Sequence, residues 1–340
     1  MIKVYDKFDD HLQTLWRNIE KESICTPFQT FSWCRALWDC VISQSKGNSL
    51  FVIYSEDEKT RVSLLMPLFV DESGTLRFIG DGHSDIGDAI ISGDGSRHYL
   101  FNDVSRFILS QRQIRNVVFQ KMPPSSETLS FLGVLFKGSI LYRDHAYSWI
   151  NLSKSAKLPF GYEHLRSRER KQFNAMIRRY ADVSLAVSSH SRGQSFPIGD
   201  IVEMRDFMVA RRWRKPAYLS SEITSFLNRC YDEDRLDVYF LEQNGQKKSV
   251  SLILRHGGFA CSYLMLYRDK EYNAVLNAHI IDSLSAEGVG VYNFGVGAYD
   301  YKLKKFRPEL SCTCCLRYSK SRFRRFCDYL MMIVRFVRQG

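Results

Sequence analysis

The chain has 340 residues, of which 45% are hydrophobic and 25% charged, so it can bury a full core and is long enough for two domains. This composition excludes an intrinsically disordered protein. The net charge is +11, and most of the excess lies near the C-terminus, where residues 301–340 hold eleven Lys or Arg against two acidic residues.

Two helices are predicted at the start of the chain. Residues 8–21 carry apolar side chains at helical spacing, and a second helix is expected to begin at a Ser32 cap and to bury Trp33 and Trp38. Residues 50–80 change to runs rich in β-formers, which predict a meander of three strands. The remaining predictions for the first half are a loop at 80–95, helices at 97–111 and 125–132, a strand at 116–121, and extended segments near Leu135 and at 146–152.

The second half is predicted to repeat this order. Asn244-Gly245 and Gly257-Gly258 are strong hairpin signals, and they join three predicted strands. A helix at 271–287 follows and stops at Gly288. The other helices are expected at 162–180, 198–213 and 220–231, with a strand at 183–189. The two halves share no residue-level identity, so the repeat is one of architecture.

Residues 321–340 combine apolar side chains at helical spacing with arginines between them. Such a helix could lie on an anionic membrane surface, or it could pack on the domain with its arginines in water, and both interpretations stay open. The longest apolar run there, residues 329–334, is far below the roughly 18 residues that span a membrane. The basic segment contains no recognisable nucleic-acid reading motif, so we expect no nucleic-acid partner.

The nine cysteines show no disulfide framework of a small secreted chain, and the N-terminal residues lack the apolar core of a signal peptide. We therefore expect reduced thiols and a cytoplasmic protein, with membrane association as an alternative. Cys312, Cys314 and Cys315 have no second Cys or His pair at zinc-site spacing, so we expect a strand there. No metal site is predicted.

Polar side chains gather after one predicted buried strand, in the stretch 288–306 (GVGVYNFGVGAYDYKLKKF). Glycines at 295 and 297 let backbone or ligand come close to the end of this strand. Together with the helix before it, the run 259–302 resembles the C-terminal signature of the CelD-type acetyltransferase family, which is associated with cellulose and polysaccharide biosynthesis. The basic segment LRSRERKQFNAMIRRY and the aromatic helix FQTFSWCRALWD also resemble that family, so the likeness covers about residues 26–306. Asn293 departs from the family, which usually has an acid at this place.

The resemblance implies tandem GNAT-like domains of the α/β (α+β) class, each a mixed, mostly antiparallel sheet flanked by helices. We expect the domains at 1–155 and 156–318, followed by a basic amphipathic helix at 319–340. The resemblance also implies acetyl-CoA or another acyl-CoA as co-substrate. The residues expected to bind it are Tyr267, Arg268, Asn273 and Lys302.

An acyltransferase must bring an amine or hydroxyl to a thioester carbonyl and remove its proton. Candidates for the proton transfer are His279, Asp300 and Tyr301. Arg168 and Arg170 on the basic helix are candidates for holding an anionic substrate, because arginine binds phosphates and carboxylates well. His83 and Asp85, in the predicted loop 80–95, are further substrate-binding candidates.

The sequence thus predicts an acyl-CoA-dependent N- or O-acyltransferase, acting on a small-molecule or saccharide acceptor in polysaccharide or cell-envelope biosynthesis. One alternative is a Fem-type aminoacyl transferase, which also has two GNAT-like domains and uses aminoacyl-tRNA. Another is a non-catalytic scaffold of a membrane synthase, docked through the basic C-terminal helix.

Overall fold

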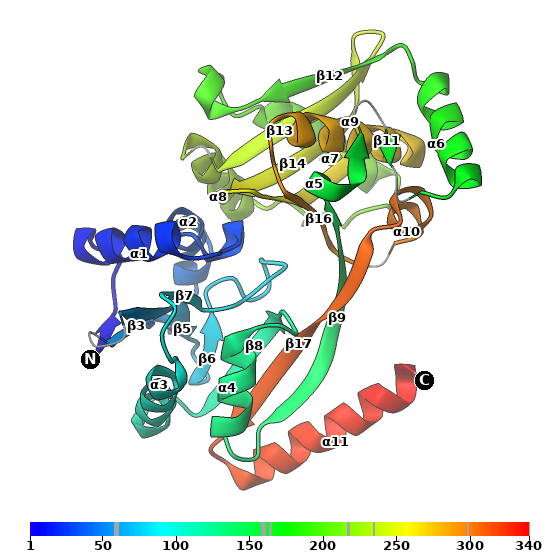
Figure 1. Cartoon of the computed structure of the whole chain (residues 1–340). Coiled ribbons are helices and arrows are strands. Elements are labelled where there is room, and N and C mark those ends of the chain that lie inside the picture. The colour runs from blue at the N-terminus through cyan, green and yellow to red at the C-terminus, as the bar shows by residue number, and fades with distance from the viewer. Residues whose placement is uncertain are drawn as a thin grey trace. The chain divides into compact units, whose positions relative to one another are not determined.

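The computed structural model describes residues 1–339 except 58–60, 158–160, 163–164, 216–217, 234 and 298. The chain forms two compact units, each built of sheet and helices (Figure 1). The first unit contains residues 1–145 and 312–340, and the second contains residues 146–311. Domain boundaries were predicted at 155 and 318. Residues 312–340 instead join the first unit, because strand β17 (Glu309–Ser319) pairs with strand β8 (Asn116–Met122) of that unit.

The first unit holds two groups of strands. One is a sheet in the order β1-β3-β4-β7, and the other runs β17-β8-β6-β5-β2. Pro67 lies between β4 and β5, and its missing N–H ends the pairing of β4. The predicted meander is therefore divided between two groups. The other elements are β1 (Ile2–Tyr5), α1 (Asp10–Glu22), η1 (Pro27–Gln29), α2 (Phe31–Cys40), η2 (Ile42–Gln44), β2 (Ser49–Leu50), β3 (Val52–Asp57), β4 (Val62–Met66), β5 (Leu68–Val70), β6 (Thr75–Phe78), β7 (Ile90–Ser92), α3 (His98–Ser110), α4 (Glu127–Leu135), β9 (Ile140–Asn151) and α11 (Arg322–Gln339).

Two local predictions in this unit need correction. The N-cap of α2 is Thr30, whose side chain accepts from the N–H of Trp33, and Ser32 lies inside the helix. The loop predicted at 80–95 contains strand β7, which pairs with β4. Strand β7 depends on a partner that is distant in the sequence, whereas Thr30 and Ser32 are both local cap residues that the sequence pattern does not separate.

The second unit is a sheet in the order β12-β13-β14-β15-β16-β9 with helices around it. Neighbouring strands are antiparallel except β15 and β16, which are parallel and joined by helix α9. This matches the need of parallel strands for a crossover connection. The elements are α5 (Leu152–Ser155), β10 (Ala156–Lys157), β11 (Gly161–Tyr162), α6 (Ser167–Arg179), β12 (Val183–Ser188), η3 (His190–Arg192), α7 (Ile198–Ala210), α8 (Ser221–Asp232), β13 (Leu236–Gln243), β14 (Gln246–His256), β15 (Phe259–Tyr267), α9 (Lys270–Ala286), β16 (Val291–Val296) and α10 (Asp300–Phe306).

Both faces of this sheet are covered. Tyr239 and Leu241 of β13 share a hydrophobic core with α6 and α9. Because side chains alternate along a strand, the buried Val238 and Phe240 point to the opposite face, and α7 and α8 contact the sheet at β13–β15. The α/β class predicted from the sequence is confirmed.

Candidate active site in the second unit

The central feature of the second unit is a fork between strands β15 and β16. The two strands pair only at Phe259 with Val291, Ala260 with Tyr292, and Cys261 with Asn293. Beyond Cys261, β15 continues for six residues, and the described sheet gives it no strand partner on the β16 side. An extended ligand could therefore bind along this edge by backbone hydrogen bonds, as an added strand does.

Both strands are irregular where they part. On β15 the pairing with β14 shifts register between Leu252 and Ile253, which leaves Tyr263 as an extra residue two positions beyond the last pair with β16. On β16 the pairing with β9 shifts between Asn293 and Val296. Gly295 lies in this shift with φ of 78°, a conformation that favours glycine. Bulges bend strands and increase their twist, so the two irregularities open the fork from both sides.

Asn293 stabilises the bend of β16. Its side chain is buried, and its Oδ1 accepts a hydrogen bond of 2.7 Å from the N–H of Gly295. The amide thus holds the chain in its turn away from β15.

A buried polar network lies on the α9 side of the fork. The Tyr292 hydroxyl on β16 donates to Oδ1 of Asn277 at 2.8 Å, and Nδ2 of Asn277 donates to the carbonyl and side-chain oxygens of Asn273. The same Nδ2 lies 3.4 Å from the sulfur of Met265 on β15. Asn277 therefore contacts β16 within the last paired residues, at Tyr292, and contacts β15 beyond the separation, at Met265.

Lys302 anchors the end of β16 from inside the unit. Its side chain is only 2% exposed, and its ammonium donates to the carbonyls of Phe294 at 2.7 Å, Gly295 at 3.3 Å and Val296 at 3.3 Å. The ammonium also lies 5.1 Å from the centroid of the Tyr299 ring. Lys302 was predicted to bind the co-substrate. In the structure its ammonium is bonded to backbone carbonyls of β16.

Acidic side chains occupy the start of α9. Asp269 is the N-cap and accepts from the N–H of Glu271 at 2.9 Å. The carboxylate of Glu271 accepts from the Tyr180 hydroxyl at 2.6 Å and lies 3.4 Å from Arg179. A helix N-terminus favours anions, but here the carboxylates of Asp269 and Glu271 already lie at that position.

Tyr267 and Arg268 end β15 and lead into α9. The Tyr267 ring packs 5.8 Å from the ring of Trp213. Arg268 forms an ion pair with Glu203 and lies over the Phe207 ring at 4.8 Å, so its guanidinium is directed to α7. Among the predicted co-substrate residues, the structure brings these two together at the end of β15, whereas Asn273 and Lys302 belong to the two buried networks described above.

Residues 167–303 match the family model described as an acetyltransferase (GNAT) domain. This match runs from the start of α6 into α10 and includes the whole fork. The second unit therefore carries a GNAT acetyltransferase domain, and the chain is an acyltransferase.

Solved structures of similar fold cover nearly the whole chain. The C-terminal domain of an Agrobacterium fabrum protein assigned as a lysylphosphatidylglycerol synthetase is 13% identical, with a TM-score of 0.56, over 89% of this chain and 96% of that one. FemX is 10% identical, with a TM-score of 0.60, over 93% and 97%. A tandem GNAT protein from the clavulanic acid biosynthesis pathway is 10% identical, with a TM-score of 0.52, over 94% and 98%. The tandem GNAT-like fold predicted from the sequence is confirmed by these likenesses, which at such identities concern the fold alone. A search of curated protein sequences found no match.

The predicted catalytic residues lie on two helices of the GNAT domain. Asp300 and Tyr301 begin α10, directly after the end of β16, but their side chains fall outside the described part of the structure. His279 lies in the middle of α9 and is partly buried, and this burial lowers the pKa of its imidazole. A neutral imidazole at pH 7 can accept a proton.

The predicted substrate-binding residues belong to different units. Arg168 and Arg170 are exposed on α6 of the second unit, and Arg170 donates to the carbonyl of Leu165 at 3.1 Å. His83 and Asp85 lie between β6 and β7 of the first unit, where burial and the nearby Lys121 lower the pKa of His83. Arg168 with Arg170, and His83 with Asp85, therefore remain two separate predictions of substrate-binding residues.

Sequence reasoning missed the polar network at the fork. Asn277 and Asn273 stand four residues apart among the apolar residues of the helix that are predicted to be buried, so they share a face. A pair of amides in a buried stripe was a usable signal, because buried polar groups need partners. Tyr292, read as part of a strand signature, supplies that partner.

Proposed function

We propose that this protein is an acyl-CoA-dependent N- or O-acyltransferase, with acetyl-CoA as the first donor to test. The observation that carries the proposal is the fork, where the described part of the sheet gives residues 262–267 of β15 no strand partner on one edge. Backbone groups on this edge can hydrogen-bond an extended amide-containing arm. GNAT domains in general use acyl-CoA, whose arm has that chemistry.

In this proposal the chain positions the acceptor and moves a proton, while the thioester supplies the activated acyl group. The acceptor amine or hydroxyl forms the new bond to the acyl carbon, its proton passes to a base, and the thiol leaves. His279, Asp300 and Tyr301 are the candidates for the proton transfer. Since the pKa of His279 is lowered, its imidazole is in the form that accepts a proton at neutral pH.

Calorimetry with acetyl-CoA tests donor binding, and hydrogen exchange locates it. Binding along the fork should slow exchange of amides in 262–267, while amides of the β13–β14 pairing serve as the internal control. Thiol release with a panel of amines and sugars tests turnover. Absence of heat, of added protection and of thiol release with several acyl-CoA donors would rule the proposal out.

A second candidate function is aminoacyl transfer from aminoacyl-tRNA. The start of α9 favours this candidate. A helix N-terminus can hold the diphosphate of a CoA donor, but here the carboxylates of Asp269 and Glu271 lie at that terminus and would repel it. The likeness to FemX fits this candidate at the level of fold. Filter retention and acyl transfer with charged tRNA, measured beside acetyl-CoA, separate the two donors, because only one should be consumed.

For the acceptor we propose a saccharide or another cell-envelope precursor. The resemblance to the CelD-type family supports a saccharide, and the likeness to a lysylphosphatidylglycerol synthetase domain keeps lipid-linked acceptors in the panel. Peripheral membrane contact through α11 is part of the same proposal, and the surface that would make it is described below.

A further inference from the structure

Helix α11 turns its large apolar side chains outward. Among the described side chains of the helix, Phe323 is 77% exposed, Phe326 59% and Met331 56%. Tyr329 and Leu330 are exposed as well. A helix that packs on a domain buries such a face, so this arrangement does not match the packed interpretation of the C-terminal helix.

Polar contacts hold α11 on the first unit. Arg317 of β17 forms an ion pair of 3.1 Å with Asp328, and the Arg325 guanidinium donates to the carbonyl of Lys137 at 3.3 Å. Arg325 also lies 5.9 Å from the centroid of the Tyr318 ring. The helix is thus attached by its charged side, which leaves the apolar side in contact with solvent.

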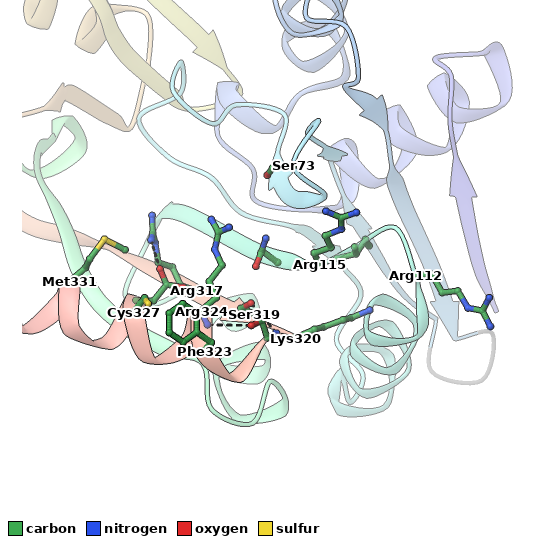
Figure 2. Close-up of a pocket in the computed structure, with 14 residues that line it drawn as sticks. Ser73, Arg112, Arg115, Arg317, Ser319, Lys320, Phe323, Arg324, Cys327 and Met331 are labelled. Atoms are coloured by element: carbon green, nitrogen blue, oxygen red, sulfur yellow. Dashed lines mark hydrogen bonds and ion pairs between the residues drawn. The ribbon is translucent and has the colours of Figure 1, made fainter.

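A basic hollow of about 730 Å³ lies beside α11 (Figure 2). Phe323, Cys327 and Met331, spaced four residues apart on the helix, line it together with cationic side chains from β17 and from the segment before β8. Its basic residues are Arg112, Arg115, Arg317, Lys320 and Arg324, and Asp328 is the one acidic residue among the described residues that line it.

Most of the basic side chains of the hollow have no acidic partner among the described residues. Asp328 is already paired with Arg317. The described residues place no acid in an ion pair with Arg112, Arg115 or Arg324. The hollow therefore combines uncompensated guanidinium groups with an apolar wall.

We propose that α11 and the basic hollow form one docking surface for an anionic lipid bilayer. Phe323, Phe326 and Leu330 enter the boundary between headgroups and acyl chains, and Arg112 and Arg115 bind headgroup phosphates. An apolar face bordered by arginines is the pattern by which helices bind in the plane of anionic membranes. Within the described residues, no helix is long and apolar enough to cross a membrane.

Charge and apolarity together favour a bilayer over other partners. A second copy of α11 would bring arginines against arginines at the rim of the apolar face. A nucleic acid would neutralise the arginines but would leave the exposed Phe, Leu and Met side chains facing water. A bilayer with anionic headgroups satisfies both groups of side chains.

Vesicle sedimentation of the full-length protein tests the proposal. We expect binding to phosphatidylcholine vesicles that contain phosphatidylglycerol, weaker binding as salt rises, and little binding to phosphatidylcholine alone. Phe323→Asp with Phe326→Asp should weaken binding at least about tenfold, because two apolar contacts are replaced by charges that the membrane repels. Replacing Arg112 and Arg115 by Gln should weaken it about fivefold for each arginine.

Ile24→Asp is the matched control, because Ile24 is a fully exposed apolar residue that does not line the hollow. It should bind vesicles as the wild type does, and all variants should keep the wild-type circular dichroism and thermal melt. The proposal is overturned by equal binding to neutral and anionic vesicles, or by unchanged binding of the Phe323→Asp, Phe326→Asp variant. It is also overturned if the surface instead mediates dimerisation or retains RNA on a filter.

Discussion

Replacing Lys302 by Met tests whether the end of β16 depends on a buried ammonium. The substitution keeps most of the side-chain volume, removes the charge and deletes the donors to the carbonyls of Phe294, Gly295 and Val296. These carbonyls belong to the arm of the fork that bends away from β15. Without the ammonium, the two oxygens of Phe294 and Gly295, which lie in buried residues, lose the partner seen here.

A charge-assisted hydrogen bond contributes roughly 1.5–3 kcal/mol, and removing one partner also leaves the other unsatisfied. Against this, burying the ammonium is itself unfavourable, and Met relieves that cost. One bond here is short and two are long, so we expect a net loss of about 2–4 kcal/mol in the free energy of unfolding of the second unit. For a unit of this size the loss corresponds to a fall in melting temperature of roughly 5–15 °C.

Thermal melting by circular dichroism measures the loss, and hydrogen exchange of residues 291–297 shows where it acts. Lys304→Met is the matched control, since Lys304 lies on the same helix with an exposed side chain and should change stability by less than about 0.5 kcal/mol. Equal melting temperatures for the two variants, together with unchanged exchange along β16, would refute the assigned role of Lys302. The donor affinity of the folded Lys302→Met variant should also fall, because the fork has lost its support.

Three further predictions follow from named contacts. Tyr292→Phe removes the hydroxyl that donates to the buried Asn277, so urea unfolding should show a loss of about 1–2 kcal/mol, whereas the exposed Tyr99→Phe should show none. Glu271→Gln removes a carboxylate at the start of α9 and keeps an acceptor for Tyr180; if acetyl-CoA places its diphosphate there, calorimetry should show about two- to fivefold tighter binding, and an unchanged affinity would mean that the diphosphate binds elsewhere. Burial raises the pKa of Asp88 from its usual value to about 6. Between about pH 4 and pH 6 the carboxyl is therefore protonated in the folded state and ionised in the unfolded state. The stability of the fold falls as pH rises through this range. Asp88→Asn removes this dependence and should be more stable than the wild type by about 2 kcal/mol at pH 7.5 but not at pH 4, which urea midpoints at the two pH values would check.

Elements with a complete local signal were predictable from the sequence. Helix α9 was expected at 271–287 and is found at Lys270–Ala286, and Gly288 after it has φ of 78°, which explains why a glycine ends it. The hairpin between β13 and β14 forms at Asn244-Gly245, where both residues have positive φ as such a turn requires. In these segments the pattern within about a dozen residues determines the structure.

Features set by distant partners were not predictable. The separation of β15 from β16 depends on register shifts against β14 and β9, and no local pattern encodes a register between strands far apart in the sequence. The Lys302 side chain points into the unit because it bonds to three carbonyls, and these carbonyls come together only where β16 bends. The outward face of α11 depends on the Arg317 to Asp328 ion pair, which the helical pattern alone could not foresee.

Asn293 shows how the fork can keep its shape without the acid that the resembling family usually has at this place. Its Oδ1 accepts from the N–H of Gly295 at 2.7 Å, a bond that needs an oxygen acceptor but no charge. A carboxylate could make the same bond, so the amide preserves the bend of β16 and hence the open edge of β15. An amide cannot take up a proton at neutral pH, however, so the base for acyl transfer must come from another residue. The departure at 293 therefore leaves the bend of β16 intact. If the fork binds the donor as we propose, the base must be sought on α9 and α10, where His279, Asp300 and Tyr301 are the residues to substitute first.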